Sequence, residues 1–413
     1  MSKQISRRDF VKAGSSTAAL LASTPLVYAG GQEQTISVGL IGCGGRGTGA
    51  AENCLESSEN VKLVAMGDMF KDRIDGSRRS LSKRDGFKVN DDNVFVGFDA
   101  YKKVLDTGVN MVILATPPGF RPIHFAAAID AGKHVFFEKP VGVDPVGIRK
   151  VIEYGKKAKE KKLAVVTGTQ RRHEKTYNEA IGRIHDGAIG DIVAGRAYWN
   201  GDTPWVNARK PGQNDMEYQL RNWYHYTWLC GDHIVEQHVH NLDVMNWVMK
   251  GHPLSAVAVG GKQVRTGPEY GVGWDHFAVD FEYANDVHVM SMCRHWPKSP
   301  GNVSEAVVGT KGKSDCNRNI TGANPWKFEG QNNKPYVQEH TDLIKSIREG
   351  KPLNEAEQVA HSTLTAIMGR EAAYTGQILK WDQFLNSDLD LSPAKYEFGP
   401  LPEPAVAIPG KKG

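Results

Sequence analysis

The sequence predicts an α/β protein, with a doubly wound parallel sheet in its first half and an α+β second half built on a large, mostly antiparallel open sheet. Three observations support this fold class. Short apolar runs alternate with helical segments up to about residue 167, a glycine-rich turn follows the first run, and strand-like runs succeed one another from Ile192 onward. Strands that alternate with helices favour a parallel sheet, and successive strands favour an antiparallel one.

The composition is typical of a globular chain large enough for two domains. Of the 413 residues, 40% are hydrophobic and 24% are charged. The net charge is +4, of which residues 1–29 hold +3 through Lys3, Arg7, Arg8 and Lys12 against Asp9. The remaining charge of about +1 argues against nucleic acid as a partner. The five cysteines are scattered without a CxxC pair, so neither a disulfide framework nor a zinc cluster is indicated.

The N-terminus has the pattern of an export signal. Ser6-Arg7-Arg8-Asp9-Phe10 precedes an apolar run over residues 13–27, and Val27-Tyr28-Ala29 offers small residues to a signal peptidase. We therefore expect residues 1–29 to be a twin-arginine signal peptide that takes the folded protein through the Tat export machinery to the periplasm. A basic helix start followed by a surface helix is the alternative. The apolar run is too short to span a bilayer, and no integral membrane segment is expected.

A glycine-rich turn follows the first predicted strand, residues 35–41. Gly42, Gly44 and Gly47 have the G-x-G-x-x-G spacing, and a helical segment comes directly after them. In this context the first glycine permits a tight turn, the second lets the backbone approach a pyrophosphate, and the third allows the helix to pack closely on the strand. The helix N-terminus offers free N–H groups to phosphates, so we expect this turn, with Gly45 and Arg46, to bind a dinucleotide. A glycine-rich loop without a ligand is the alternative.

An acidic residue comes just after the second predicted strand, residues 61–66. Asp68 lies 21 residues beyond Gly47, where a carboxylate can accept hydrogen bonds from the hydroxyls of the adenosine ribose. A carboxylate at this place repels a 2′-phosphate, so NAD is the expected cofactor. Lys71 and Arg73 are the nearby cations that could favour NADP instead.

The alternation continues through strands at 109–115, 134–137 and 164–167 and helices at 124–131 and 145–161. Ligands of doubly wound sheets bind at the carboxyl ends of the strands. The residues at these ends are therefore expected at the edge of the cofactor, and they are Thr116, Pro117, Glu138 and Lys139. Together these features predict a Rossmann NAD-binding domain at residues 30–168.

The second half has a different pattern. Strands are predicted at 192–199, 257–264, 276–283, 287–293 and 305–308, with closing helices near 337–348 and 355–379. One face of such a sheet is expected to carry helices and the other to be available for a ligand or a subunit. We place a substrate and oligomerisation domain at residues 169–392 and an extended, proline-rich tail at 393–413.

A helix over residues 231–247 carries an unusual set of polar side chains. Asp232 is a plausible N-cap, and five residues recur at spacings of three and four, which places them on one face: His233, Glu236, His240, Asp243 and Trp247. Such a face lines a cleft or points to solvent. A carboxylate one turn from a histidine can orient the ring for general-base chemistry. A metal site at the histidines is a weaker alternative, since the order is not HExxH, and no metal is expected.

Aromatic rings are dense between residues 199 and 228, interleaved with Arg209, Arg221 and His225. Flat rings beside hydrogen-bond donors suit the faces and hydroxyls of a sugar, and Trp223 and Tyr224 are the candidates for substrate contact. Each ring taken alone is more often core than platform, and Trp228 and Trp247 are assigned to packing.

Four motifs make the chain resemble the Gfo/Idh/MocA family of oxidoreductases: GLIGCGGRG at the first turn, ATPP at 115–118, FFEKPVG at 136–142 and HSTLTAIMGREAAYTGQ at 361–377. The resemblance implies that Lys139 reaches the nicotinamide and the reacting hydroxyl, and that Pro140 is cis. It also implies catalytic roles for Glu236 and His240 and a substrate role for Asp243, although the family usually has Asp where Glu236 stands. It further places His124 and Gln170 near the cofactor, and Arg172 and His233 near the substrate.

The function these features favour is an NAD-dependent oxidoreductase acting on a sugar, glycoside or cyclitol. His240 would take the hydroxyl proton, Lys139 would hold the oxygen, Glu236 would orient His240, and Asp243 would bind a neighbouring hydroxyl. Export of a folded protein fits a cofactor that is loaded in the cytoplasm, tightly held and recycled in the site. An NAD-dependent glycosidase that oxidises its sugar only transiently is the first alternative, and a non-catalytic sugar sensor is the second. A homo-oligomer is expected.

Overall fold

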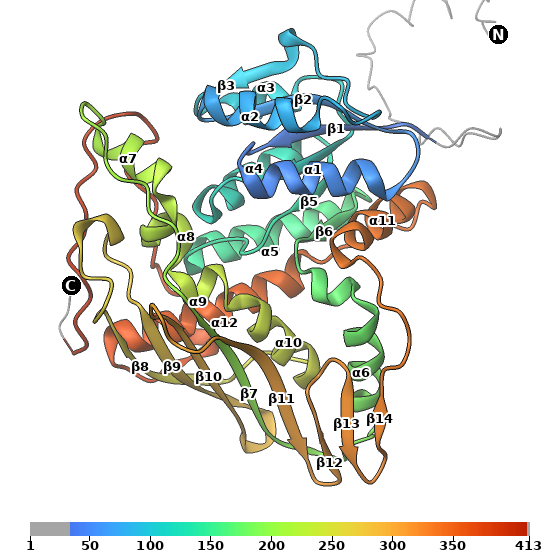
Figure 1. The fold of residues 1–413 in the computed structure, drawn as a ribbon, viewed down its shortest axis with the longest axis vertical. Helices are drawn as coiled ribbons and strands as arrows, with labels where there is room; N and C mark the ends of the chain where they lie inside the picture. Colours follow the sequence, from blue (N-terminus) through green and yellow to red (C-terminus); the bar gives the residue numbers. More distant parts are fainter. Residues whose placement is uncertain (1–33, 411–413) are drawn as a thin grey trace, which may run out of the picture. The chain divides into compact units, whose positions relative to one another are not determined.

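The first sheet forms from short runs of buried Val, Ile, Leu and Met. In this computed structural model, which describes residues 34–410, six parallel strands have the order β3-β2-β1-β4-β5-β6 (Figure 1). Their bounds are β1 Ile36–Ile41, β2 Val61–Asp68, β3 Val94–Val96, β4 Met111–Leu114, β5 His134–Phe137 and β6 Val165–Thr167. This order is that of the doubly wound dinucleotide-binding fold, with the change of direction between β1 and β4, so the predicted fold class is confirmed for this half. The predicted signal at 1–29 lies outside the described residues.

Five α-helices accompany this sheet: α1 Gly45–Ser57, α2 Lys71–Leu81, α3 Ala100–Leu105, α4 Arg121–Asp130 and α5 Pro145–Glu160. The start of α5 is fixed by Asp144, whose side chain accepts a hydrogen bond from the Gly147 N–H, and by Pro145 in the first turn. The sequence did not predict α2, β3 or α3. Residues 71–108 are rich in charge and only Ile74, Ser77 and Leu81 of α2 are buried, so their apolar periodicity is weak.

The second sheet has nine strands in the order β14-β13-β12-β11-β7-β10-β9-β8-β15. Its long strands are β7 Ile192–Gly201, β8 Ser255–Gly261, β9 His276–Tyr283, β10 Val287–His295 and β11 Asn302–Gly309; its short ones are β12 Gly312–Ser314, β13 Asn319–Gly322, β14 Trp326–Lys327 and β15 Leu379–Lys380. Only β7 and β10 pair in parallel, and every other pairing is antiparallel. The prediction of a large, mostly antiparallel sheet is confirmed.

Helices cover one face of this sheet (Figure 1). They are α6 Lys175–His185, α9 His233–Glu236, α10 Val239–Met249 and α12 Ala356–Thr375, while α11 Pro335–Arg348 packs on α1 of the first half. Helix α12 is buried along most of its length because it packs against both α5 and β8. It ends at Thr375, four residues before the predicted end, and the following Gly376 takes a left-handed conformation (φ +68°) that caps it.

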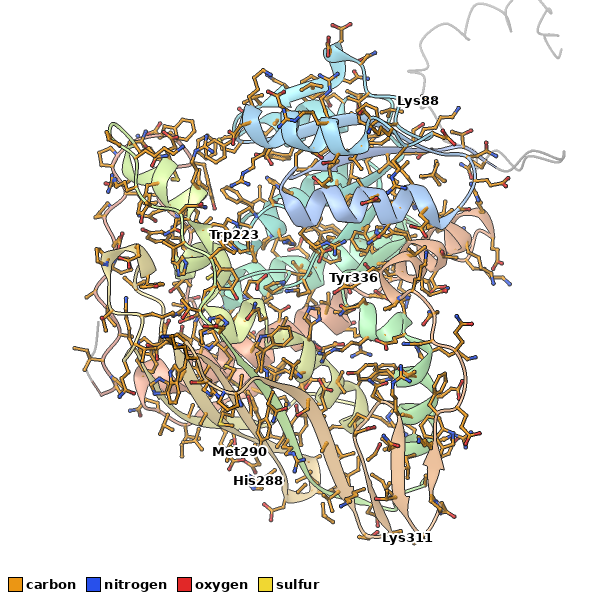
Figure 2. The ribbon with its side chains drawn as sticks, viewed as in Figure 1. Lys88, Trp223, His288, Met290, Lys311 and Tyr336 are labelled. Carbon is orange, nitrogen blue, oxygen red and sulfur yellow. The ribbon has the colours of Figure 1, made fainter. Side chains whose placement is uncertain are left out.

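The opposite face of the second sheet is open to solvent and partly apolar. The register places Val257 of β8, Asp280 of β9 and Met290 of β10 side by side, and Val259 and Met292 lie two residues further along the same face. These valines and methionines are exposed, and Figure 2 shows Met290 and His288 of the interior strand β10 on the lower side of the sheet.

The end of the chain returns to the first half. The remaining short α-helices are α7 Asp215–Arg221, α8 Thr227–Cys230 and α13 Trp381–Leu385, and α13 comes just before the final segment of the chain. Residues 386–410 contain no helix or strand, and Tyr396 and Leu401 pack on a small apolar cluster with Phe120 and Tyr226. The described residues from Thr35 onward form one compact unit, and the domain boundaries stay a prediction. No helix within residues 34–410 is long and apolar enough to cross a membrane.

Candidate functional site

The glycine turn between β1 and α1 has the geometry that a dinucleotide requires. Gly42 has φ +97°, and a Cβ on Gly47 would lie 1.9 Å from the Gly42 carbonyl oxygen, so the third glycine is what lets α1 approach the turn. Around Gly44 and Gly45 no atom lies within 4 Å of an added Cβ, which leaves open space at the start of α1. No side chain caps α1, so its first N–H groups face this space.

Asp68, the last residue of β2, is fixed at the same edge of the sheet. Its carboxylate accepts hydrogen bonds from the Cys43 N–H (2.6 Å) and the Phe70 N–H (2.9 Å). Burial raises the pKa of Asp68, and the two N–H groups and the nearby Arg73 charge oppose this rise. The second acceptor sites of both oxygens remain for a ligand, as expected for a carboxylate that binds ribose hydroxyls.

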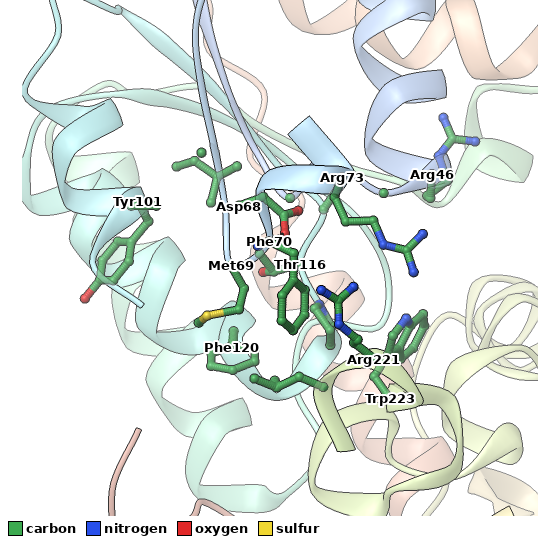
Figure 3. Close-up of a pocket in the computed structure, with 18 of the residues that line it drawn as sticks. Arg46, Asp68, Met69, Phe70, Arg73, Tyr101, Thr116, Phe120, Arg221 and Trp223 are labelled. Carbon is green, nitrogen blue, oxygen red and sulfur yellow. Dashed lines mark hydrogen bonds between the residues drawn. The ribbon is translucent and has the colours of Figure 1, made fainter. Parts of the chain in front are cut away.

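A cavity of about 530 Å³ runs along this edge. It is lined by the predicted cofactor residues Gly42, Gly44, Gly45, Arg46, Asp68, Thr116, Pro117 and His124. Figure 3 shows Asp68, Thr116 and Phe120 around one part of it, with Arg46 at the far end. The His124 ring lies between Tyr101 and Phe120 and contacts the Thr116 hydroxyl at 3.2 Å, and burial lowers the pKa of His124 to about 3.

Glu138, Lys139 and Gln170 do not line that cavity but lie at the ends of β5 and β6. The Glu138 carboxylate pairs with the Arg46 Nε at 2.9 Å, which ties the glycine turn to the end of β5. The Gln170 Oε1 is buried and has no hydrogen-bond partner within the described part of the chain. Its free acceptor suits a ligand with a donor, such as a carboxamide.

The Lys139–Pro140 peptide is cis, and Lys139 points toward the second half of the chain. Its Nζ donates to the Glu236 carbonyl oxygen (2.5 Å) and contacts the Glu236 Oε1 at 3.3 Å. Only 12% of the Lys139 side chain is exposed. The ammonium and the carboxylate of Glu236 thus form a nearly buried ion pair across the two halves of the molecule.

Glu236 therefore binds Lys139, and no hydrogen bond joins Glu236 to His240. The ring of His240 stacks on Trp199 of β7 at a centroid distance of 6.0 Å. Burial lowers the pKa of His240 well below its usual value, and the charges of Lys139, Arg171 and Arg46 add to this effect. The expectation that Glu236 orients His240 is therefore wrong in this structure. The lowered pKa of His240 favours its neutral imidazole, which is the form that accepts a proton.

The prediction of one continuous helix with one polar face over 231–247 is also wrong. Asp232 does act as the N-cap, but α9 ends at Glu236, and α10 begins at Val239 after a break at Gln237 and His238. His233 is consequently turned into the core, where its ring packs against Phe277 and His295. His233 is 1% exposed and does not share a face with His240.

Asp243 and Arg172 bind each other instead of opening onto the site. The Arg172 Nε and Nη2 donate to both oxygens of Asp243 at 2.8 to 3.1 Å, and the Ser362 hydroxyl donates to the Asp243 Oδ1 at 2.7 Å. Asp243 is 1% exposed. The predicted role of Asp243 in binding a substrate hydroxyl conflicts with this buried carboxylate, which is ion-paired with Arg172.

The two aromatic candidates have different environments. Trp223 lines the same cavity as Asp68 and Thr116, so it belongs to the predicted cofactor side. Tyr224 is buried, and its hydroxyl has no hydrogen-bond partner in the described residues. The negative charge of Glu236 contributes to the raised pKa of Tyr224, after burial, so the ring lies near the Lys139–Glu236 pair.

Sequence reasoning missed several residues that build the site. Arg121 is fully buried and donates to the carbonyl oxygens of Thr116 (2.7 and 3.1 Å) and Pro140 (3.2 Å), which fixes the ends of β4 and β5 relative to each other. The only feature of the sequence that could have pointed to Arg121 is its position three residues after the ATPP turn. Phe70, Phe98 and Tyr101 also line the cavity, and no local pattern marked them. Arg221, which the sequence placed among the aromatic residues of the predicted substrate segment, lines it as well.

The site residues fit a dinucleotide. An uncapped helix N-terminus, open space at two glycines and a fixed acidic residue at the next strand end are arranged around one cavity. Among residues 34–410, no group of three His, Cys, Asp or Glu could hold a metal ion. The fold and the site define a dinucleotide-binding protein built on a doubly wound parallel sheet.

Two family models match this chain. Residues 36–168 match the one described as an oxidoreductase family with an NAD-binding Rossmann fold. Residues 177–314 match the GFO/IDH/MocA C-terminal domain. The chain belongs to the Gfo/Idh/MocA family of oxidoreductases, and NAD is the cofactor of its Rossmann domain.

Curated relatives include inositol dehydrogenases. The myo-inositol 2-dehydrogenase of Thermotoga maritima is 24% identical over 212 residues, which cover 51% of this chain and 54% of that protein. The scyllo-inositol 2-dehydrogenase (NAD(+)) of Bacillus subtilis is 28% identical over 171 residues, 41% of this chain and 45% of that protein. The chain thus spans about half the length of the curated relatives it matches.

Solved structures share the fold over more of the chain. The scyllo-inositol dehydrogenase of Lactobacillus casei with bound NAD(H) and scyllo-inositol has a TM-score of 0.65 and 20% identity, over 84% of this chain and 99% of that one. A probable dehydrogenase of Thermotoga maritima has a TM-score of 0.63 and 17% identity, and the match covers 84% of this chain and 100% of that one.

Removing the carboxylate of Asp68 is expected to weaken NAD binding roughly ten- to hundredfold, because a hydrogen bond to a charged group contributes about 1.5–3 kcal/mol. Asp68→Ala should also narrow the preference for NAD over NADP, since the repulsion of a 2′-phosphate is lost. The measurement is the Kd of both nucleotides by fluorescence titration, with the melting temperature taken alongside. Asp75→Ala is the control, because Asp75 pairs with Lys71 away from the cavity. An unchanged ratio of the two Kd values contradicts the assignment.

Proposed function

We propose that the protein is an NAD-dependent oxidoreductase that acts on a hydroxyl of a sugar, glycoside or cyclitol. The observation that carries this proposal is the position of Lys139 at the carboxyl end of β5, directly after Glu138, which pairs with the cavity-lining Arg46. The buried His240 lies within the electrostatic influence of the Lys139 ammonium, which helps to lower the pKa of His240. The inositol dehydrogenases among the relatives support a cyclitol or sugar ring as the substrate class.

The residues have distinct tasks in this proposal. The N–H groups at the start of α1 would bind the pyrophosphate, and Asp68 would bind the adenosine ribose. The nicotinamide, when bound, supplies the acceptor for the hydride of the carbinol carbon. His240 accepts the hydroxyl proton, and the Lys139 ammonium donates a hydrogen bond to the same oxygen as it becomes a carbonyl. Glu236 keeps Lys139 in place through its carboxylate and its carbonyl.

The experiment combines nucleotide analysis with a substrate screen. Purified protein is denatured and its supernatant analysed by mass spectrometry, where we expect NAD(H). The intact protein is then mixed with single sugars, glycosides and inositols while the reduced-nicotinamide absorbance is followed. A folded sample that carries and binds no NAD(H), or a screen in which no polyol reduces bound NAD, contradicts the proposal.

We further propose that the cofactor is tightly held and recycled within the site. Its support is that residues of the second half, Trp205, Asn207 and Trp223 among them, complete the cavity wall. The same property suits a redox-neutral glycosidase, in which the oxidised sugar loses its aglycone and then regains the hydride. Release of free sugar from an aryl glycoside without an external electron acceptor favours the glycosidase, whereas a requirement for an acceptor favours the net oxidoreductase.

Export through the twin-arginine pathway to the periplasm remains part of this proposal, supported by the residue order at 6–29. Replacing Arg7 and Arg8 by lysine is expected to leave a folded, NAD-loaded precursor in the cytoplasm, because the pathway reads the arginine pair. Cell fractionation with immunoblotting measures this. Full delivery of the doubly substituted protein to the periplasm contradicts the export assignment.

A homo-oligomer is the remaining element of the proposal. The apolar side chains on the open face of the second sheet, Val257, Val259, Met290 and Met292, support an interface there. Light scattering after size-exclusion chromatography gives the mass in solution, and the mass of a single chain, which is 45.4 kDa with the predicted signal and less without it, contradicts a homo-oligomer.

A further inference from the structure

The cavity wall that faces Asp68 comes from two distant parts of the chain. On the side of the first sheet it consists of Phe70, Phe98 and Tyr101; on the opposite side it consists of Trp205, Asn207, Leu220, Arg221 and Trp223. Since Asp68 stands where an adenosine ribose binds, this wall faces the adenosine half of the cofactor. Figure 3 shows Arg221 beside Phe70, with Trp223 next to it.

Arg221 is the residue that joins the two sides. Its Nη1 and Nη2 donate to the two oxygens of Asp72 at 3.2 and 3.1 Å, and its guanidinium carbon lies 3.8 Å from the centroid of the Phe70 ring. The Arg221 Nε also donates to the Glu217 Oε1 at 3.2 Å within α7. The hydrogen bond from Arg221 lowers the pKa of Asp72, as expected for a bidentate ion pair.

The C-terminal segment, residues 396–403, forms hydrogen bonds with helix α7. The Gly399 carbonyl oxygen accepts from the Met216 N–H (3.1 Å), and the Leu401 N–H donates to the Asp215 Oδ2 (3.1 Å). The Phe398 ring lies 5.4 Å from that of Phe98 and 6.4 Å from that of Phe70, centroid to centroid. This segment therefore contacts α7 on one side and the Asp68 end of the first sheet on the other.

We propose that α7 and residues 396–403 form a latch across the adenosine half of the cavity, with Arg221 as its cofactor-positioning residue, so that NAD remains bound between turnovers. This inference rests on the proposed function and gives the retention of the cofactor a structural cause. Separation of α7 from the first sheet breaks the Arg221–Asp72 pair and parts Phe398 from Phe70 and Phe98. Release of the adenosine half is thereby limited by the opening of the latch.

The test measures how fast NADH leaves the protein. The full-length mature chain is loaded with NADH and chased with excess NAD, and the decay of bound-NADH fluorescence gives the dissociation rate constant. Arg221→Ala and Phe398→Ala should each speed release by about tenfold or more, since changes at an interface act mainly on dissociation. Arg78→Ala should leave the rate within twofold, because Arg78 pairs with Asp91 on the first half and neither residue lines the cavity or belongs to the latch.

A second variant guards against misfolding. Asp72→Asn keeps the shape of a side chain that is 60% exposed, and it removes the charge that Arg221 binds. It should speed release as well, and combining it with Arg221→Ala should add little. Parent-like release from Asp72→Asn and from a folded Arg221→Ala overturns the latch while leaving NAD binding intact. A parent protein that binds no NADH overturns the latch and the proposed function together.

Discussion

Replacing His240 by alanine is expected to lower the rate of hydride transfer roughly a hundred- to ten-thousand-fold, the usual effect of losing a positioned general base. The nucleotide should stay bound, because the glycine turn and Asp68 lie at the other end of the site. Lys139→Ala should have a comparable effect, since the same hydroxyl oxygen loses its hydrogen-bond donor. Single-turnover absorbance of the reduced nicotinamide, with a reactive sugar or inositol, measures both.

Two controls separate this role from a general loss of structure. His288→Ala removes a surface histidine that pairs with Asp280 on the open face of the second sheet, and it should leave the rate unchanged. In the parent, burial and the Lys139 charge lower the pKa of His240, so its proton-accepting form persists at pH values well below 6.5. The rate should therefore fall only on strong acidification. A fall in the hydride-transfer rate that begins at or above pH 6.5 indicates that another group is the base. A parent-like rate in His240→Ala indicates the same.

Gly47→Ala is expected to abolish tight NAD binding. The added Cβ would lie 1.9 Å from the Gly42 carbonyl oxygen, so either α1 or the turn has to move. Overpacking of this kind costs about 1–3 kcal/mol in stability, and the moved N–H groups no longer converge on the pyrophosphate. The measurements are the stoichiometry of NAD in the purified protein and its melting temperature.

The control for this substitution lies on the same helix. A Cβ on Gly49 meets only the Arg46 guanidinium at 3.7 Å, which is ordinary contact, so Gly49→Ala should bind NAD as the parent does. Full NAD occupancy in Gly47→Ala would show that the close approach of α1 to the turn is not what forms the site.

The sequence by itself determined the elements whose signals are local. Apolar runs of four to eight residues with glycine turns predicted five of the six strands of the first sheet, and the strand-rich pattern after Ile192 predicted the second. The positions of Gly42 and Asp68 at strand ends, and of Gly47 in the first turn of the following helix, followed from the same pattern. The strand-end rule and helical spacing already marked Lys139 and His240, whereas the specific catalytic roles of both residues came largely from family resemblance and stay predictions.

Only the tertiary structure decided which polar side chains meet. Helical spacing put His233 and Asp243 on one face with His240, but the break after Glu236 turns His233 into the core, and Arg172 neutralises Asp243. Glu236 binds Lys139, which is 97 residues away in sequence, because the buried ammonium needs a counter-charge. The Arg221–Asp72 pair spans 149 residues. Spacing fixes neighbours within a helix or strand, whereas partners across the fold depend on how the two sheets pack, and no local pattern encodes that.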